Sequence, residues 1–318
     1  MRVLVVGAGA TGGYFGGRLL QAGRDVTFLV RPRRAAELAS TGLMIKSPNG
    51  DVTLPRPATI LAESIRQPFD LILLSCKAYD LAGAIASFAP AVGPETLILP
   101  LLNGMRHLDL LEARFGRTNV LGGLCAIAAT LDDKRVVVHL STLHSLAFGA
   151  RDGDRPERIR RVADVMIGAG FDARASEHIV HDMWEKWVFL AMLAGATCLM
   201  RAPVGDIVAS PGGTELILAL LDECRAVAEV AAYAPRSAFM AQTRATLTAN
   251  GSLFTASMLR DIEGNGPIEA DHILGDLIAR RDPAAAKRGV LSALQLAYAH
   301  LKAYEARRAR TRAVPTHC

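Results

Sequence analysis

Three glycines near the amino terminus have the spacing of a phosphate-binding turn. Gly7, Gly9 and Gly12 form a G-x-G-x-x-G pattern. In such a pattern the first glycine permits a tight turn, the second lets a pyrophosphate approach the backbone, and the third lets the following helix pack closely. The free N–H groups at the start of that helix would then hold phosphate. The pattern predicts dinucleotide binding through Gly7, Ala8, Gly9, Ala10, Thr11 and Gly12.

The segments around this turn have the pattern of a strand, a helix and a second strand. Met1–Val6 is a short apolar run rich in β-branched residues, which is typical of a buried strand. Tyr14–Ala22 has helical spacing, Gly23 ends it, and Asp25–Val30 predicts the next strand. A glycine-rich turn without a ligand is the alternative interpretation. The position of the motif between a strand and a helix favours dinucleotide binding.

The end of the second predicted strand carries a cation where an NAD site usually carries an acid. An Asp or Glu at this point binds the ribose hydroxyls of NAD. Residues 26–36 contain no acid, and Asp25 lies at the other end of the strand. Arg31 stands at the tip, followed by Arg33 and Arg34. A guanidinium can hold a 2′-phosphate by paired, charged hydrogen bonds, so the sequence favours NADP(H). The alternative is that these arginines form a solvated helix start.

Two further polar residues follow predicted strands. Asp70–Ser75 and Thr96–Pro100 are continuous apolar runs, as in a parallel sheet that is covered on both faces. Lys77 follows the first run and Asn103 follows the second. Ligands of open α/β sheets bind beyond the carboxyl ends of the strands. We therefore expect Lys77 and Asn103 at the same edge as Gly9, although either residue alone would be an ordinary surface lysine or turn asparagine.

A lysine in an apolar helix is the candidate proton donor. Reduction of a ketone by a nicotinamide cofactor needs a proton for the oxygen. Lys186 follows Trp184 and Glu185 and precedes a long uncharged apolar run. Burial would lower the pKa of such a lysine and make it a better proton donor near neutral pH. The alternative is a lysine whose stem lies on apolar surface while its ammonium group reaches water.

The remaining pattern predicts an α/β domain followed by an all-helical one. Leu43–Lys46 and Val52–Leu54 predict a hairpin. Later strand patterns without intervening helices predict a mixed extension of the sheet; they are Val120–Thr130, Arg135–His139 and Ser145–Phe148. From Ile179 onward only helical spacing remains, including one continuous helix over Pro267–Arg280. We predict a doubly wound Rossmann-type domain at residues 1–176 and a helical substrate and catalytic domain at 177–318, with a frayed basic tail.

Composition agrees with a globular protein that binds small anionic ligands. A length of 318 residues suggests about two domains, and 51% hydrophobic residues allow a substantial core. The net charge of +5 is mild and aromatic residues make up only 5%, so we predict no nucleic-acid partner. An anionic small-molecule substrate and a phosphorylated cofactor suit this charge.

Cysteine usage and hydropathy predict a cytoplasmic protein. The five cysteines are odd in number and form no C-x-x-C pair, which is typical of a reducing compartment and gives no metal signature. The nearest approach to a transmembrane segment, Val188–Met200, is too short to span a bilayer. We therefore predict no metal ion and no membrane partner. A homodimer is compatible with the sequence.

Taken together in chain order, these motifs resemble the ketopantoate reductase (2-dehydropantoate 2-reductase) family. The glycine run alone is shared with many dehydrogenases. The more specific pieces span nearly the whole chain, and they are Cys76–Asp80, Leu102–Gly104, Trp184–Lys186, Ser257–Asp261 and Glu269. The twelve-residue step from Ser257 to Glu269 also matches the family.

The resemblance implies an activity and a role for each matching residue. The family reduces a 2-oxo acid with NADPH, in pantothenate biosynthesis, and binds the cofactor between a Rossmann-type domain and a helical domain like that of 6-phosphogluconate dehydrogenase. By resemblance, Lys186 would be the general acid, and Glu269 would hold the forming hydroxyl and orient the lysine. The other implied contacts are Arg31 to the 2′-phosphate, Lys77, Ala128 and Glu269 to the cofactor, Asn103 to cofactor and substrate, and Ser257 to the substrate carboxylate.

Three positions depart from the family pattern. The family typically has Asn four and eight residues after the catalytic lysine, where this chain has Leu190 and Ala194. A further family Asn corresponds to Val204. Because a site that lacks such hydrogen bonds cannot discriminate for polar groups, the chemistry transfers more securely than the substrate. A 2-oxo acid less polar than ketopantoate is therefore an alternative substrate.

Two other functions compete with this interpretation. A β-hydroxyacid dehydrogenase that works in the oxidative direction also combines these domain types, but the pair Ser257 and Glu269 argues against it. A non-catalytic, redox-sensing NADP(H)-binding protein would need the catalytic half to be lost. Lys186 and Glu269 are both present.

Overall fold

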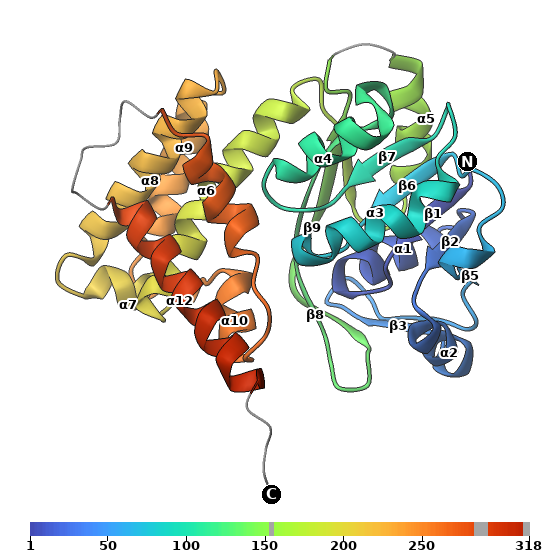
Figure 1. Cartoon of the computed structure of the whole chain (residues 1–318), viewed down its shortest axis with the longest axis horizontal. Coiled ribbons are helices and arrows are strands. Elements are labelled where there is room, and N and C mark those ends of the chain that lie inside the picture. Colours follow the sequence, from blue (N-terminus) through green and yellow to red (C-terminus); the bar gives the residue numbers. More distant parts are fainter. Residues whose placement is uncertain (153–155, 283–291, 314–318) are drawn as a thin grey trace, which may run out of the picture. The chain divides into compact units, whose positions relative to one another are not determined.

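The computed structural model describes residues 1–152, 156–282 and 292–313, with side chains up to residue 311 (Figure 1). Contacts between residues divide the chain into two compact units. The first contains Met1–Leu102 and Arg106–Val180, and the second contains Asn103–Met105 and the chain from His181 onward. The division falls after Val180, where the sequence places it after residue 176. The three-residue segment Asn103–Met105 belongs by its contacts to the second unit.

The first unit contains a five-stranded parallel sheet with the order β5-β2-β1-β6-β7. Three of its strands are buried at every residue, which confirms the expectation of a sheet covered on both faces. The strands are β1 (Val3–Val6), β2 (Val26–Leu29), β5 (Thr59–Ile60), β6 (Leu71–Leu74) and β7 (Leu97–Pro100). The helices of this half are α1 (Ala10–Gln21), α2 (Pro32–Thr41), α3 (Leu81–Phe88) and α4 (Arg106–Phe115).

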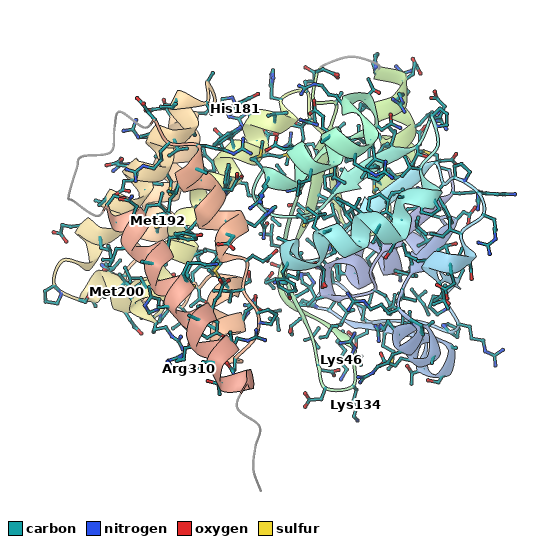
Figure 2. All side chains as sticks on the ribbon, viewed as in Figure 1. Lys46, Lys134, His181, Met192, Met200 and Arg310 are labelled. Atoms are coloured by element: carbon teal, nitrogen blue, oxygen red, sulfur yellow. The ribbon has the colours of Figure 1, made fainter. Side chains whose placement is uncertain are left out.

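A second, mixed sheet completes the first unit. Its strands are β3 (Leu43–Lys46), β4 (Val52–Leu54), β8 (Gly122–Leu131), β9 (Val137–Gly149) and β10 (Asp172–Ala175), and α5 (Pro156–Met166) precedes β10. β3 and β4 form the predicted hairpin. The prediction that the later strands extend the first sheet is confirmed only at Val120, which forms a parallel bridge to Ile98 of β7. For the rest it is wrong, because β9 pairs with β3, β8 and β10 in the second sheet. Lys134 lies at the tip of the long β8–β9 hairpin (Figure 2).

Helix α1 packs closely against both sheets. A Cβ at Gly16 would lie 2.7 Å from the ring of Phe28 in the first sheet. A Cβ at Gly17 would lie 2.7 Å from Ile45 in the second sheet. Small residues therefore let one helix pack closely against both sheets, and its large side chains join a single core with them.

The second unit is helical throughout its described residues. It contains α6 (Ile179–Met200), α7 (Val204–Ala209), α8 (Gly213–Val230), α9 (Ser237–Leu247), α10 (Ser257–Glu263), a π-helix (Asp271–Gly275), α11 (Asp276–Ala279) and α12 (Ala293–Ala313). The single helix expected over Pro267–Arg280 is wrong, because the chain forms a π-helix and a short α-helix there. α7 and α10 are two helices that the sequence periodicity did not predict.

Helix α6 is the central helix of this unit by burial. It is long and apolar enough to cross a membrane by length and composition, but 72% of its most apolar window is buried inside the protein. Met192 in mid-helix is fully buried, whereas Met200 at the end is exposed (Figure 2). This burial is the pattern of the core helix of a globular unit.

Candidate functional site

The glycine turn after β1 has the geometry that its sequence predicts. Gly7 adopts a φ of +94°, a conformation that residues with a side chain rarely adopt. A Cβ at Gly12 would lie 2.1 Å from Ser75 Oγ and 2.2 Å from the Gly7 carbonyl oxygen. Any larger residue at position 12 would therefore push α1 away from β1 and β6. Ser75 Oγ also donates to the Val6 carbonyl at 2.9 Å, which fixes the turn from the neighbouring strand.

The start of α1 offers backbone donors beside open space. Gly9 is the N-cap residue, and Ala10 and Thr11 begin the helix. No described atom beyond its near neighbours lies within 4 Å of the position that a Cβ on Gly9 would take. An anion can approach the first N–H groups of the helix closely at this point. This arrangement fits the pyrophosphate of a dinucleotide.

Arg34 is hydrogen-bonded to the glycine turn. From the sequence it is expected only as part of the start of a helix. Its guanidinium is nearly buried and donates from Nε to the Ala8 carbonyl at 3.2 Å and from Nη1 to Glu37 at 3.2 Å. Burial lowers the pKa of Arg34, while the hydrogen bond to Glu37 opposes that shift. Arg34 therefore stabilises the turn through a nearly buried hydrogen bond, whereas Arg31 is exposed to solvent.

Arg31 lies at the carboxyl end of β2, at the start of α2. Its side chain is 84% exposed, and one guanidinium nitrogen lies 3.1 Å from Asp80 Oδ1. Asp80 ends the short turn that follows Lys77 and is itself 45% exposed. The structure thus gives Arg31 an acidic partner from the segment after β6. An exposed pair of this kind is weak, about 0–1 kcal/mol, so it leaves Arg31 able to meet a phosphate.

The structure brings Gly9, Arg31 and Lys77 to the carboxyl ends of three adjacent strands, β1, β2 and β6. Asn103 follows β7 but belongs by its contacts to the helical unit. The neighbouring Gly104 has a φ of +77°, and a Cβ there would lie 2.9 Å from the His272 carbonyl oxygen. The backbone beside Asn103 therefore packs directly on the π-helix.

Ala128 occupies an irregularity between β8 and β9. Ile127 pairs with His144 and Ala129 pairs with His139, so Ala128 stands alone opposite the four β9 residues 140–143, which are the extra residues of this irregularity. A bulge of this kind turns backbone groups away from the regular pairing and is frequent beside binding sites. The position expected to contact the cofactor through its backbone is thus one whose backbone leaves the sheet ladder.

Lys186 lies half-buried near the amino end of α6, next to two buried acids. Those acids are held by Arg236, which lies 2.5 Å from Asp182 and donates from Nε to Glu185 at 2.9 Å. Hydrogen bonds from Glu185 and Asp182 raise the pKa of Arg236, which therefore stays charged. This ion cluster fixes the first turns of α6, and with them the lysine.

Glu269 lies half-buried directly before the π-helix. Its carbonyl oxygen accepts from the backbone N–H groups of both His272 (3.1 Å) and Ile273 (3.0 Å). The indole Nε1 of Trp187 donates to the Ile273 carbonyl oxygen at 2.9 Å. The helix of Lys186 and the segment of Glu269 are therefore joined by one buried hydrogen bond within the second unit. The sequence analysis did not single out Trp187.

Ser257 is the exposed first residue of α10. Of the positions that depart from the family pattern, Leu190 is half-buried on the same face of α6 as Lys186. Ala194 and Val204 are only 4% and 1% exposed.

Metal ligands and reactive thiols are the other chemical groups to consider in the described part of the chain. No group of three or more His, Cys, Asp and Glu side chains gathers there in a way that could hold a metal ion. Burial raises the pKa of Cys198 to about 12, and that of Cys224 is raised as well, so neither thiol is a ready nucleophile.

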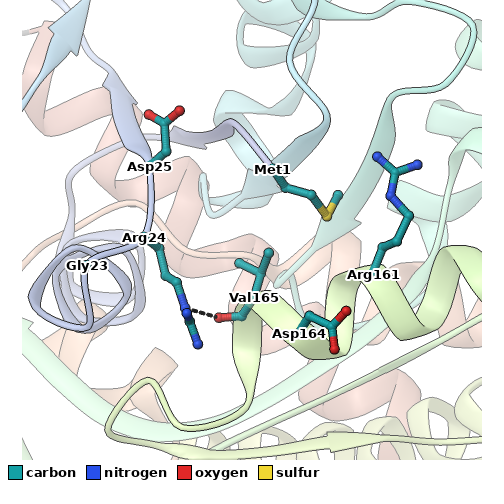
Figure 3. A pocket seen from close by; sticks show the side chains of 7 residues that line it. All are labelled: Met1, Gly23, Arg24, Asp25, Arg161, Asp164 and Val165. Carbon is teal, nitrogen blue, oxygen red and sulfur yellow. Dashed lines mark hydrogen bonds between the residues drawn. The ribbon is translucent and has the colours of Figure 1, made fainter.

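A hollow of about 430 Å³ lies away from the residues described above (Figure 3). It is lined by Met1, Gly23, Arg24, Asp25, Arg161, Asp164 and Val165, and Arg24 Nε donates to the Val165 carbonyl at 3.0 Å. These residues precede β1 and β2 or belong to α5. The hollow is therefore at the amino ends of the strands, opposite the edge where the glycine turn lies.

Comparison with known proteins covers both units. Residues 3–153 match the family model described as ketopantoate reductase PanE/ApbA, and residues 178–305 match the model of its C-terminal part. An uncharacterized oxidoreductase of Bacillus subtilis (strain 168), YkpB, is 40% identical over 308 residues, which cover 96% of this chain and 99% of that protein. A 2-dehydropantoate 2-reductase of Mesorhizobium japonicum is 24% identical over 89% of this chain and 94% of its own length.

Solved structures share the whole fold. The crystal structure of 2-dehydropantoate 2-reductase from Geobacter metallireducens GS-15 has a TM-score of 0.84 at 28% identity, covering 95% of this chain and 99% of that one. A ternary structure of D-mandelate dehydrogenase with NADH and anilino(oxo)acetate has a TM-score of 0.85 at 20% identity, covering 97% and 100%. At that identity the second likeness concerns the fold alone.

Proposed function

Because the chain belongs to the ketopantoate reductase family, we propose that this oxidoreductase uses NADPH to reduce a 2-oxo acid to a 2-hydroxy acid. The observation that carries the proposal is the hydrogen bond from Trp187 to Ile273, which joins the helix of Lys186 to the segment of Glu269. Acid and carboxylate thus come from two segments that one contact holds in fixed register. Such a pair suits a reaction in which one oxygen must gain a proton.

The first unit supplies most of the cofactor contacts in this proposal. The N–H groups at Gly9, Ala10 and Thr11 bind the pyrophosphate, and Gly7 and Gly12 let the backbone come close enough. Lys77 and the backbone at Ala128 contact the ribose and nicotinamide side, and Asn103 of the second unit joins them there. When bound, the reduced nicotinamide supplies the hydride that reaches the carbonyl carbon of the substrate.

Arg31 selects the phosphorylated cofactor in this proposal. Its exposure and the lack of an acid at the tip of β2 support a contact with the 2′-phosphate. A phosphate carries close to two negative charges and accepts several hydrogen bonds. It should therefore displace the single exposed carboxylate of Asp80 from the guanidinium.

The second unit supplies the acid and the substrate contacts. Lys186 gives a proton from its ammonium group to the carbonyl oxygen as the carbon is reduced. Glu269 accepts a hydrogen bond from the new hydroxyl and orients the lysine. The hydroxyl of Ser257 and the amide of Asn103 bind the substrate, with Ser257 at its carboxylate.

A panel of 2-oxo acids tests the proposal. Oxidation of NADPH is followed with ketopantoate, pyruvate and longer 2-oxo acids, and the same panel is repeated with NADH. We expect turnover with at least one 2-oxo acid, a 2-hydroxy acid as product, and a higher kcat/KM with NADPH. Failure to reduce every 2-oxo acid with either cofactor would contradict the proposed reaction. Equal kcat/KM with both cofactors would contradict only the role of Arg31 and would leave the proposed reaction in place.

A further inference from the structure

The loop before Ser257 exposes two large apolar side chains. Leu253 is 85% exposed and Phe254 is 42% exposed. The ring of Phe254 lies beside that of Phe189 in α6, with 6.0 Å between centroids and 39° between planes. This is the spacing of an aromatic pair in direct contact. An apolar surface is therefore open to solvent three residues before the residue that would bind a substrate carboxylate.

The same aromatic pair borders the face of α6 that carries Lys186. Phe189 and Leu190 are three and four residues beyond Lys186, so all three share one face of the helix. All three are half-buried, whereas Leu193 on the next turn is 2% exposed. The accessible part of this face thus combines one lysine with two apolar side chains.

The loop that carries Phe254 is fixed by its backbone. The Phe254 carbonyl accepts from the Val204 N–H at 3.0 Å, and the Ser252 carbonyl accepts from the Gly205 N–H at 2.8 Å. A Cβ at Gly205 would lie only 2.4 Å from the Ser252 nitrogen, so glycine is needed for this approach. Phe254 is held as a preformed surface, which lowers the ordering cost of a ligand that packs on it.

The far side of the loop is anchored to the same helix. The Ala256 N–H donates to Thr197 Oγ1 at 3.4 Å. Thr197 is eleven residues beyond Lys186, which is three helical turns, and so lies on the same side of α6. The loop from Phe254 to Ser257 therefore runs along the lysine-bearing side of the helix.

We propose that Phe189 and Phe254, with Leu190, form the subsite for the side chain of the substrate, and that this substrate is a 2-oxo acid with an aromatic side chain. The inference rests on the proposed function, which places the carboxylate at Ser257 and the carbonyl oxygen at Lys186. A planar ring beyond the carbonyl carbon would then pack on the aromatic pair. A short side chain would leave the aromatic pair exposed to water. A hydroxylated side chain would leave its own hydroxyl without a hydrogen-bond partner.

A second copy of the chain is the competing occupant of this apolar surface. Leu253 is the more exposed neighbour, and a dimer contact centred here would bury it together with Phe254. The lysine on the same helix face favours a small anion, because it pairs with a carboxylate or a polarised carbonyl and would be costly to bury in an apolar dimer contact.

The test compares kcat/KM for phenylglyoxylate and pyruvate with NADPH, in the full chain and in two neighbouring variants. We expect the unmodified protein to prefer phenylglyoxylate by roughly tenfold or more. Phe254→Ala should remove most of this preference, because it should lower the phenylglyoxylate value several times more than the pyruvate value. Leu253→Ala is the matched control, because it deletes the more exposed side chain, and it should keep the preference.

Each other result has a defined meaning. An unmodified protein that turns over 2-oxo acids without preferring the aromatic one overturns the subsite and leaves the reaction standing. Equal effects of Phe254→Ala and Leu253→Ala, with a change of mass in solution for both, assign the surface to a second copy and also overturn it. If no 2-oxo acid is reduced, calorimetric binding of phenylglyoxylate decides. Binding that Phe254→Ala abolishes supports the subsite while the proposed reaction fails, and absence of binding rejects both.

Discussion

The indole nitrogen of Trp187 and the carbonyl oxygen of Ile273 are joined by a hydrogen bond of 2.9 Å. Trp187 is 1% exposed and follows Lys186 directly in α6. Ile273 lies in the π-helix, and its own N–H donates to the carbonyl of Glu269. Two consecutive hydrogen bonds therefore lead from the neighbour of the proposed acid to the backbone of the proposed carboxylate. π-Helical segments are frequent at functional sites, which agrees with this position.

Trp187→Phe should lower kcat more than it changes substrate or cofactor binding. The variant keeps an aromatic ring but removes the donor to Ile273, so the spacing of Lys186 and Glu269 is no longer fixed. We expect kcat to fall roughly tenfold, since small displacements of reacting groups are costly. We also expect the free energy of unfolding to decrease by about 1–3 kcal/mol, because a buried hydrogen bond is lost. Steady-state kinetics and urea unfolding measure the two effects. Trp184→Phe is the control, because Trp184 is also buried, at 3% exposed, and its replacement leaves the hydrogen bond from Trp187 to Ile273 in place. An equal loss of kcat in both variants would show that general packing is responsible.

Arg31→Ala should weaken NADPH binding by about 1.5–3 kcal/mol, the scale of a charged hydrogen bond, and NADH binding far less. Asp80→Asn tests the same contact from the other side. Since it removes the carboxylate that competes for Arg31, NADPH should bind up to about fivefold more tightly, which corresponds to an exposed ion pair of at most about 1 kcal/mol. Fluorescence titration with both cofactors gives the dissociation constants. Equal losses for NADPH and NADH in Arg31→Ala would refute the phosphate contact.

Lys186→Ala should lower kcat by on the order of 10²–10⁴, because it removes the group that protonates the carbonyl oxygen. The affinity for NADPH should stay nearly unchanged. Single-turnover kinetics on the best substrate separate this chemical step from product release. If the variant turns over at nearly the original rate, another group protonates the oxygen and Lys186 is a surface lysine with a buried stem.

The stability of the first unit should fall in mild acid through His144. Burial lowers the pKa of His144, with smaller lowering effects from His139 and Arg18, while Asp172 acts in the opposite direction. Tyr14 Oη lies 2.7 Å from its Nδ1. As the pH falls below about 6.5, the usual pKa of a histidine, the unfolded chain takes up this proton before the folded one. The free energy of unfolding therefore decreases with falling pH in that range.

Thermal unfolding between neutral pH and about pH 5 measures this dependence. His144→Gln should flatten it, since the variant has no proton to take up at this position. The exposed His178 offers the control substitution, His178→Gln. A pH dependence that is the same in the unmodified protein and in His144→Gln would show that carboxyl groups elsewhere dominate.

Local chemistry was the part of the structure that the sequence could predict. The roles of Gly7 and Gly12 follow from steric rules within a short segment, and the turn has that geometry. The apolar runs at β1, β6 and β7 likewise form the buried parallel strands that their composition predicts. These features depend on contacts close in sequence or on the burial of a whole strand.

Long-range pairing decided the features that the sequence could not predict. β9 pairs with β3, and the paired residues Ile45 and Val137 are more than ninety residues apart. The sequence of neither strand specifies which other strand it will pair with. The π-helix after Glu269 is hydrogen-bonded to two helices distant in sequence. Trp187 of α6 donates to the Ile273 carbonyl, and Tyr298 Oη of α12 donates to Asp271 at 2.6 Å. Periodicity alone gives such a segment as an ordinary helix.

The irregular pairing opposite Ala128 bears on how this protein should be mapped by mutagenesis. In the proposed function Ala128 contacts the cofactor through its backbone, and replacing its methyl group would leave its N–H and carbonyl groups in place. The same holds for Gly9, Ala10 and Thr11 at the start of α1. An alanine scan would pass over these positions almost without signal and would attribute cofactor recognition to Arg31 and Lys77 alone. Replacing single peptide links by esters would measure the contribution that the scan leaves invisible.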